Sequence, residues 1–313
     1  MTTATSSNTV WFSNFPNGRF ANAAFQFWFA RYLQQVRNYQ VLIGNPEVPT
    51  TEIPWSMFNL PDHTPAISLL PEKSFGSPLQ LSLDRSDLPE FDVLRIDQHF
   101  EHNPGSVLCV DGFFQYDTGS IALDDAYMET FTRCLLPSTQ GTTHFQQVIW
   151  QYQQALLASF KSSYLVGLHV RRGDYLAYNN DIFFTLNLDQ VVEQLHALFL
   201  RDHVLDTLIY VATDDAAYCK QYFSQKGLDI LTSQDVLPSN TQSEVNCLAH
   251  DLAALSCAQL LVASNSSFSM LSALMNQRAR IFWRQSTNGQ LVSFDPWNTP
   301  ILYGMYKSPL NEK

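Results

Sequence analysis

Residues 164–175 read Tyr-Leu-Val-Gly-Leu-His-Val-Arg-Arg-Gly-Asp-Tyr, an apolar run that changes abruptly into a charged one. The apolar part predicts a buried strand over Tyr164–Val170, and the charged part predicts a polar loop. Similar apolar runs follow, each separated from the next by a helical segment. This alternation is typical of a parallel sheet with helices on both faces, whose ligands bind where the strands end.

The alternation extends along most of the chain and predicts an α/β fold of two halves that join between residues 140 and 163. The predicted strands are Asn8–Phe15, Gln40–Ile43, Val107–Asp111, Tyr164–Val170, Thr207–Ala212, Asp229–Leu231, Gln259–Ala263 and Ala279–Trp283. The predicted helices are Phe20–Asn38, Ala122–Leu135, Thr142–Phe160, Asn187–Arg201, Asp215–Lys226, Ser243–Ala258 and Ser266–Asn276. A tight turn is expected at Asn17–Arg19, and a proline-rich, irregular segment with short helices or strands at about residues 46–100.

The composition describes an acidic protein that is poor in charge. Of the 313 residues, 15% are charged and 13% aromatic, and the formal charge is −11. Binding to nucleic acid without sequence specificity needs a broad basic surface, so we exclude nucleic acid as a partner. An anionic small molecule would need some of the 18 basic residues gathered at one place.

We expect a cytoplasmic protein without stable membrane insertion. The polar segment Met1–Asn8 lacks the basic and apolar regions of a signal peptide. The longest uncharged stretch, Leu252–Gln277, contains too many polar residues for a transmembrane helix. The five cysteines are odd in number and far apart, which indicates reduced thiols and neither a disulfide framework nor a zinc site.

The pair Arg171-Arg172 is the first candidate for ligand binding. Adjacent guanidinium groups can hold phosphate oxygens in a bidentate manner. His169 stands at the end of the same predicted strand, and Asp174 can orient a guanidinium group or cap the following turn. The alternative is a solvated surface loop.

Asp214 and Asp215 follow the predicted strand Thr207–Ala212. Carboxylates in this place can accept hydrogen bonds from a base or a ribose. They also suit the N-cap of the next helix or a metal site. A metal ion on a nucleotide-sugar is usually held by an Asp-x-Asp pair, which the chain lacks.

The segment Asn265-Ser-Ser-Phe-Ser269 begins a helix with a turn rich in hydroxyl groups. Free backbone N–H groups and the helix dipole can bind an anion there, whereas a plain N-cap by Asn265 or Ser266 is the alternative. Taken together, the three loops predict a pocket for a nucleotide diphosphate.

These segments, in this order, resemble the shared motifs of α1,2- and α1,6-fucosyltransferases and protein O-fucosyltransferases. His-Val-Arg-Arg-Gly-Asp-Tyr at 169–175 and Asn-Ser-Ser-Phe-Ser at 265–269 are similar to motifs of glycosyltransferase family 11, the α1,2-fucosyltransferases, in the soluble form found in bacteria. Residues 18–26 resemble the family's N-terminal signature, with Ala21 and Ala23 where the family usually has Gly and Gln. Residues 111–115 resemble its Gly-Tyr-Phe-Gln stretch.

The resemblance implies a GT-B-like fold in which two Rossmann-type halves face a cleft. Residues 1–150 would form the acceptor-side domain and residues 151–313 the donor-binding domain. The implied reaction is inverting transfer of L-fucose from GDP-β-L-fucose to O2 of a terminal β-galactose of an oligosaccharide, with no cofactor and no metal ion. The alternatives are another linkage or GDP-sugar, or a non-catalytic glycan-binding relative.

The resemblance also assigns roles by matched position. Arg171, which would bind the diphosphate and neutralise the leaving GDP, and Asn22 are expected to be catalytic. The expected donor-binding residues are His169, Arg172, Asp174, Asp214, Asp215, Asn265, Ser266, Ser267 and Phe268. The expected acceptor-binding residues are Asp111, Gln115 and Tyr116. The catalytic base is left open among Asp111, Glu101 and His102, since a dissociative reaction needs no strong base.

Overall fold

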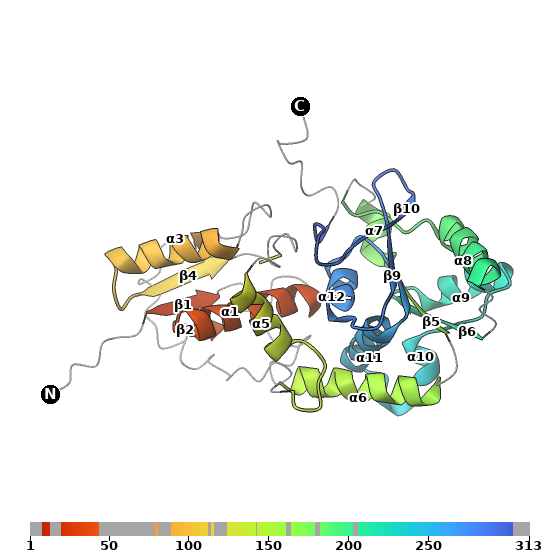
Figure 1. Ribbon diagram of the computed structural model, residues 1–313, viewed down its shortest axis with the longest axis horizontal. Helices are drawn as coiled ribbons and strands as arrows, with labels where there is room; N and C mark the ends of the chain where they lie inside the picture. Colours follow the sequence, from red (N-terminus) through yellow and green to blue (C-terminus); the bar gives the residue numbers. More distant parts are fainter. Residues whose placement is uncertain are drawn as a thin grey trace. The chain divides into compact units, whose positions relative to one another are not determined.

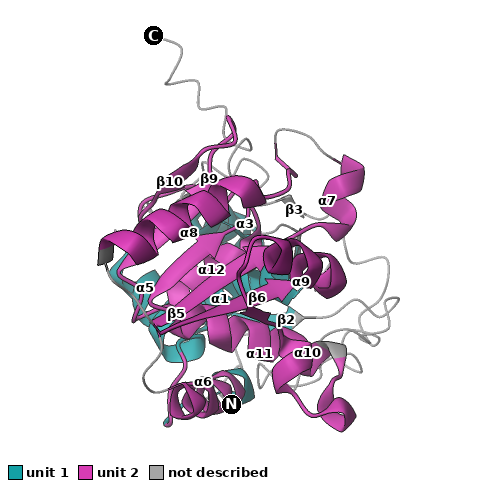
Figure 2. Ribbon diagram, turned by 90° about the vertical axis from the view of Figure 1, so that its right-hand side faces the viewer, with its two compact units in different colours: residues 1–136, 140–146 teal, residues 137–139, 147–313 magenta. Residues whose placement is uncertain are grey.

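The computed structural model describes residues 8–12, 20–43, 79–80, 89–111, 114–115, 124–141, 143–160, 164–178, 182–202 and 206–302. The chain divides into two compact units, residues 1–136 with 140–146, and residues 137–139 with 147–313 (Figure 2). The division falls within helix α6 (His144–Ser159). Each unit is built on its own sheet, with helices packed against it (Figure 1).

Unit 1 contains a sheet of four parallel strands in the order β2-β1-β4-β3. Its elements are β1 (Thr9–Phe12), α1 (Phe20–Val36), β2 (Gln40–Ile43), β3 (Leu79–Gln80), α3 (Pro89–His102), β4 (Val107–Asp111) and α5 (Asp125–Cys134). The predicted strands and helices of this half are found, with ends that differ by a few residues. The turn expected at Asn17–Arg19 lies outside the described residues.

Helix α1 is apolar on nearly all sides and forms the centre of unit 1. A helix of this kind is stable only when it is buried, and Trp28 at its middle is fully enclosed. The Trp28 indole N–H donates to the carbonyl of Tyr127 at 2.8 Å, and the two rings pack with centroids 4.3 Å apart. The aromatic excess of the composition therefore fills this core.

Helix α3, with 14 residues, is longer than the short helices or strands predicted within residues 46–100. Pro89 occupies its first position, where proline needs no N–H partner and its fixed φ suits a helix. Val93, Ile96 and Phe100 follow at helical spacing and are buried. The abundance of proline before Pro89 hid this pattern in the sequence.

Unit 2 contains a sheet of six strands in the order β10-β9-β8-β5-β6-β7. Its strands are β5 (Tyr164–Val170), β6 (Thr207–Thr213), β7 (Ile230–Leu231), β8 (Leu260–Ala263), β9 (Ile281–Gln285) and β10 (Leu291–Ser293). Its helices are α7 (Gly173–Tyr178), α8 (Leu188–Asp202), α9 (Ala216–Gln225), α10 (Ser233–Val236), α11 (Glu244–Cys257) and α12 (Ser267–Met275), with a 3₁₀ turn η3 (Ser239–Thr241).

Side chains of β5 alternate between the two faces of this sheet. Val166 and Leu168 belong to the buried cluster that includes the apolar face of α8. Gly167 and His169 face the other way, toward α11 and α12, respectively. Both faces are therefore covered, as the near-continuous apolar strands predicted, and the α/β fold class is confirmed.

The last strand departs from the predicted sheet, because β10 pairs with β9 in the antiparallel direction. A short turn joins the two strands, and Gly289 in it has a φ of 83°, which favours glycine. The Asn288-Gly289 pair is a typical hairpin signal, and it marks a strand that the sequence analysis did not include.

Candidate active site

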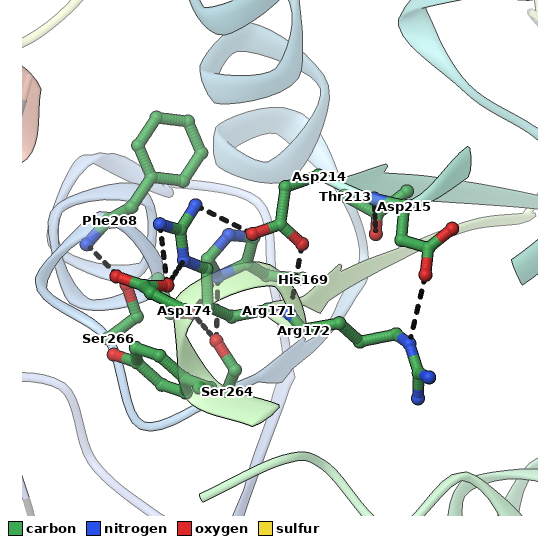
Figure 3. Close-up of polar contacts among 12 residues, drawn as sticks. His169, Arg171, Arg172, Asp174, Thr213, Asp214, Asp215, Ser264, Ser266 and Phe268 are labelled. Carbon is green, nitrogen blue, oxygen red and sulfur yellow. Dashed lines mark hydrogen bonds and ion pairs between the residues drawn. The ribbon is translucent and has the colours of Figure 1, made fainter. Parts of the chain in front are cut away.

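The three candidate loops of unit 2 follow neighbouring strand ends. β5 lies between β8 and β6. The chain leaves β5 toward β6 and β7 and then returns to the other side of β5 to form β8 and β9. The carboxyl ends of β5 and β8 therefore form the switch point at which parallel α/β sheets bind ligands. The loops that begin at Arg171, Asp214 and Ser264 all lie there (Figure 3).

Arg171 lies directly after β5, and two carboxylates hold its guanidinium group. Its Nε and Nη2 donate to Asp174 Oδ1 at 3.0 and 2.8 Å, and Nη1 lies 2.9 Å from Asp214 Oδ2 (Figure 3). The side chain is only 15% exposed. A guanidinium group has five N–H groups, so two remain after these contacts to donate to a ligand. Asp174 thus orients a guanidinium group, one of the two roles predicted for it.

The Arg172 side chain points in a different direction from that of Arg171 and anchors the loop after β5. Its guanidinium carbon lies 3.3 Å from the centroid of the Tyr218 ring, and Nε donates to Asp215 Oδ2 at 3.3 Å. Its backbone N–H donates to Asp214 Oδ1 at 2.9 Å. Asp215 also caps α9 by accepting the Tyr218 N–H at 3.2 Å, which confirms the N-cap alternative for one of the two aspartates.

Gly173 follows the two arginines because no larger residue fits there. A Cβ atom at this position would lie 2.7 Å from Asp214 Oδ2, the oxygen that contacts Arg171. A contact under 3 Å between carbon and a carboxylate oxygen forces one of them to move. The glycine therefore permits the close approach that orients Arg171.

His169 is buried beneath the loop, on the face of β5 toward α12. Its Nδ1 lies 2.6 Å from Ser269 Oγ and 2.8 Å from Ser264 Oγ. Burial lowers the pKa of His169 to about 4, so the imidazole is neutral at pH 7. A neutral ring adds no charge to the site, and its Nε2 contacts no polar atom in the described ranges.

The serine-rich turn forms the N-terminus of α12. Ser266 is the N-cap, and its hydroxyl accepts the Phe268 N–H at 3.2 Å. This confirms one of the two cap alternatives, while Ser267 stands at the first helical position. The Phe268 ring packs against His169 with centroids 5.1 Å apart. The positive end of the α12 dipole thus faces the same strand edge as Arg171.

Asn265 ties four segments of the chain together. Its amide oxygen accepts from Arg284 Nη2 at 2.8 Å, its Nδ2 donates to the Ile182 carbonyl at 2.6 Å, and its own carbonyl accepts the Tyr175 hydroxyl at 2.8 Å. Asn265 is 1% exposed and Arg284 is 2% exposed. Asn265 was predicted to bind the donor, and that role stays a prediction beside this structural one.

In unit 1 the structure brings together two of the predicted residues. The Gln115 amide donates to Asn22 Oδ1 at 2.7 Å, linking the start of α1 to the segment after β4. The preceding residue, Phe114, has a φ of 52°, a strained value for an aromatic residue, and its ring stacks on Phe29 at 4.6 Å. The strain positions Gln115 against Asn22.

The other candidate residues of unit 1 are the predicted acceptor-binding residues Asp111 and Tyr116 and the candidate bases Glu101 and His102. The Asp111 backbone ends β4, and Tyr116 lies outside the described residues. Glu101 and His102 are exposed at the end of α3, where His102 Nδ1 contacts the Gln98 carbonyl at 2.7 Å.

No group of three or more His, Cys, Asp or Glu side chains in the described ranges is arranged to hold a metal ion. Among the helices of the same ranges, none is both long enough and apolar enough to cross a membrane.

The comparison with protein families finds one match. Residues 142–289 match the family described as glycosyl transferase family 11. The matched region is similar to family 11 glycosyltransferases and contains all the donor-side loops described above, from His169 to Phe268. No curated protein matches the chain.

Solved fucosyltransferase structures resemble the whole chain. NodZ α1,6-fucosyltransferase co-crystallised with GDP is 13% identical over 93% of this chain and 98% of that one, with a TM-score of 0.50. A variant of FUT1 from Arabidopsis thaliana in complex with GDP is 15% identical over 89% and 70%, with a TM-score of 0.46. POFUT1 in complex with GDP-fucose is 13% identical over 90% and 98%, with a TM-score of 0.45. The likeness to NodZ shows a shared fold and confirms the GT-B-like class.

Sequence reasoning missed several residues that shape the candidate site of unit 2. Tyr175 and Tyr218 support the two arginines, and Ser264 and Ser269 hold His169. Arg284 is the one with a visible signal, because a charged residue inside the apolar run of β9 indicates a buried polar contact.

Proposed function

We propose that the protein transfers L-fucose from GDP-β-L-fucose to O2 of a terminal β-galactose and inverts the anomeric centre. The supporting observation is Arg171, held at the switch point of a region similar to family 11 glycosyltransferases, with two N–H groups available to a ligand. The complexes of related folds with GDP and GDP-fucose support the same donor. The galactose acceptor and the α1,2 linkage rest on the sequence motifs.

Arg171 acts on the leaving group in this proposal. As the bond between fucose C1 and the β-phosphate oxygen breaks, its electron pair passes to that oxygen and the negative charge of GDP increases. A fixed guanidinium group stabilises this developing charge more than the charge of the intact donor, and therefore accelerates the step. Asp174 and Asp214 keep the group in place, so little reorganisation is needed.

The N-terminus of α12 and His169 complete the donor side. Ser266 and Ser267 offer hydroxyl and backbone donors toward the phosphates, and the helix dipole adds to the positive potential. His169, which is neutral, would contact guanine or ribose through Nε2. Asp215 lies beside the same loop and would accept from the ribose hydroxyls through its remaining lone pairs, whereas both oxygens of Asp214 hold the arginine pair.

The acceptor hydroxyl attacks C1 from the face opposite GDP and loses its proton, which gives the α-fucoside. We propose a catalytic role for Asn22 and an acceptor-binding role for Gln115, whose amide donates to Asn22, and we leave the base unassigned. We also propose that the reaction needs no metal ion, since Arg171 and the start of α12 provide the positive charge that the diphosphate requires.

The test is a transfer assay with purified protein, GDP-fucose and a panel of lactose, type 1 and type 2 disaccharides, with and without EDTA. Linkage analysis of the product by NMR should find fucose on O2 of galactose. A product fucosylated elsewhere would reject the linkage, and loss of activity in EDTA would reject the metal-free reaction. No transfer, together with no thermal stabilisation by GDP, would favour a glycan-binding relative.

Arg171→Ala should lower kcat by about 10²–10³-fold while the protein stays folded, because this range is typical of removing one donor to a developing charge. The matched control is Arg201→Ala, which removes an exposed arginine at the end of α8 and should leave kcat unchanged. Full activity in Arg171→Ala would overturn the proposal.

A further inference from the structure

A pocket of about 430 Å³ lies at the opposite edge of the unit 2 sheet from Arg171. Its lining residues in the described ranges are Tyr164, Gln259, Arg278 and Arg280, which precede or begin β5, β8 and β9. Strand β5 separates this pocket from Arg171 by about 20 Å, at about 3.3 Å per residue. The pocket is therefore distinct from the proposed donor site, and its volume is in the range of small-molecule sites.

The lining offers hydrogen-bond donors and positive charge. Neither the Arg278 nor the Arg280 guanidinium group makes an ion pair or hydrogen bond with the chain as described. Gln259 Oε1 accepts the Leu165 N–H at 2.8 Å, and the side-chain amide nitrogen Nε2 remains as a donor. No carboxylate is among the described lining residues. This set of groups is complementary to an oxyanion.

The backbone around both arginines is held in place. Asn276 Oδ1 accepts the N–H groups of Arg278 and Ala279 at 2.8 Å each, and its Nδ2 donates to the Ala258 carbonyl at 3.0 Å. The Arg280 N–H donates to the Gln259 carbonyl at 3.0 Å. Binding then requires the ordering of side chains only, which lowers its entropic cost.

A purely structural explanation accounts for one arginine. Burial raises the pKa of the Cys257 thiol at the end of α11, and the positive charge of Arg278, which follows α12, opposes this increase. A cation in this place also stabilises the negative end of the α11 dipole. This role does not explain Arg280, which is exposed beside the same pocket. Two unpaired cations at one pocket are also unusual in a chain with a formal charge of −11.

We propose that this pocket is a second ligand site, which binds the phosphate or carboxylate group of a small acidic sugar. Its guanidinium groups hold the oxyanion, and the Tyr164 ring forms an apolar wall for the sugar. The site does not depend on the proposed transfer reaction.

The experiment measures thermal stabilisation and calorimetric binding with four probes: inorganic phosphate, glucose 6-phosphate, glucuronate and neutral glucose. Each probe is tested on the wild type, on Arg171→Ala, on the double variant Arg278→Gln/Arg280→Gln and on the control Arg201→Gln. The Arg171→Ala arm removes binding of anions at the proposed donor site. The four replaced arginines are Arg171, Arg201, Arg278 and Arg280. Because each is exposed or lies in a loop, we expect the variants to fold, and circular dichroism checks this.

Binding of at least one of the three anions, but not of glucose, is expected in the wild type, Arg171→Ala and Arg201→Gln. The double variant should weaken it about tenfold or more, because each arginine makes charge-assisted hydrogen bonds. A preference for glucose 6-phosphate or glucuronate identifies which oxyanion is recognised. Unchanged binding in the double variant, loss in Arg171→Ala alone, or no anion binding above that of glucose would overturn the proposal.

Discussion

Asp214 Oδ2 lies 2.9 Å from Arg171 Nη1, and the other oxygen of the same carboxylate accepts the Arg172 backbone N–H at 2.9 Å. One side chain, directly after β6, therefore fixes both the guanidinium group of the first arginine and the backbone of the second. The orientation of the arginine pair depends on a residue that is 42 positions from Arg172 in the sequence. Asp214 is a positioning residue for the proposed reaction.

Asp214→Asn should lower kcat while the affinity for GDP changes little. The amide keeps only one acceptor, so either Arg171 or the Arg172 N–H loses its partner and the guanidinium group is less well oriented. Removing the negative charge of Asp214 from beside the diphosphate favours the binding of GDP, and this gain limits the loss of affinity. We expect about a 10–100-fold decrease in kcat, equivalent to about 1.4–2.7 kcal/mol.

Steady-state kinetics and calorimetry with GDP distinguish this role from direct contact with the donor. An increase in KM and in the Kd for GDP, with kcat unchanged, would show that Asp214 binds the ribose or guanine as the sequence motif predicted. The control is Asp206→Asn, at the other end of β6, which should alter neither constant.

Gly173→Ala should lower kcat through the same carboxylate. The new Cβ would lie 2.7 Å from Asp214 Oδ2, so the carboxylate must move away from Arg171. Kinetics of the single and double variants form a cycle: in Asp214→Ala the obstructing oxygen is absent, and adding Gly173→Ala should then have little further effect. Equal losses in both backgrounds would show that Gly173 acts in some other way.

The strand edge and its three loops could be predicted from the sequence because their signals are local. An apolar run such as Tyr164–Val170 followed by charge shows where a strand ends, and parallel topology brings such ends to one edge. The pairing of Asp214 with Arg171 follows from the register of β5 and β6, which no local pattern contains. The sequence therefore predicted that these residues meet and that Asp174 can orient a guanidinium group, but it did not predict the orienting role of Asp214.

The contacts that were missed connect distant segments. Arg284 lies in β9 and Asn265 in the loop after β8, and their hydrogen bond depends on the packing of β9 beside β8. Helix α3 was missed for another reason: its three apolar positions are spaced correctly, but the prolines before it suggested an irregular segment. In that case the sequence contained the signal, and composition was given more weight than periodicity.

Arg284→Met should destabilise the domain and loosen the loop after β8. Arg284 donates to Asn265 Oδ1 at 2.8 Å and to the Pro300 carbonyl at 2.7 Å, and both acceptors lose this partner in the variant. A buried acceptor without a partner costs about 1–3 kcal/mol. Urea unfolding should detect this loss, whereas Arg280→Met, at an exposed position, should stay within about 0.5 kcal/mol of the wild type. Equal stability of the two variants would contradict the role of Arg284.

A buried acid beneath the sheet should make stability depend on pH. Asp251 is 7% exposed, and its Oδ1 accepts the Tyr210 hydroxyl at 2.7 Å. Burial raises the pKa of Asp251 from 3.8 to about 7. The Tyr210 hydroxyl also lies 2.7 Å from His250 Nδ1, and burial lowers the pKa of His250 from 6.5 to about 4.

The two groups act on stability in opposite directions. Between about pH 4 and 7 the folded chain keeps the Asp251 proton that the unfolded chain releases, so this contribution is present at low pH and is lost as the pH rises. Between about pH 4 and 6.5 the unfolded chain protonates His250 and the folded chain does not, so the His250 contribution grows as the pH rises. In the wild type the changes of the free energy of unfolding with pH that come from Asp251 and His250 largely cancel.

Asp251→Asn removes the decrease of stability with pH that Asp251 causes and leaves the increase that His250 causes. The free energy of unfolding of the variant, relative to the wild type, should therefore increase with pH by about 1.4 kcal/mol per pH unit across the range from about 4 to 7. The Asn amide oxygen can still accept the Tyr210 hydroxyl, which keeps the packing intact. Urea unfolding at several pH values measures the difference, and a difference that stays constant with pH would show that Asp251 ionises in the folded chain as readily as in the unfolded one.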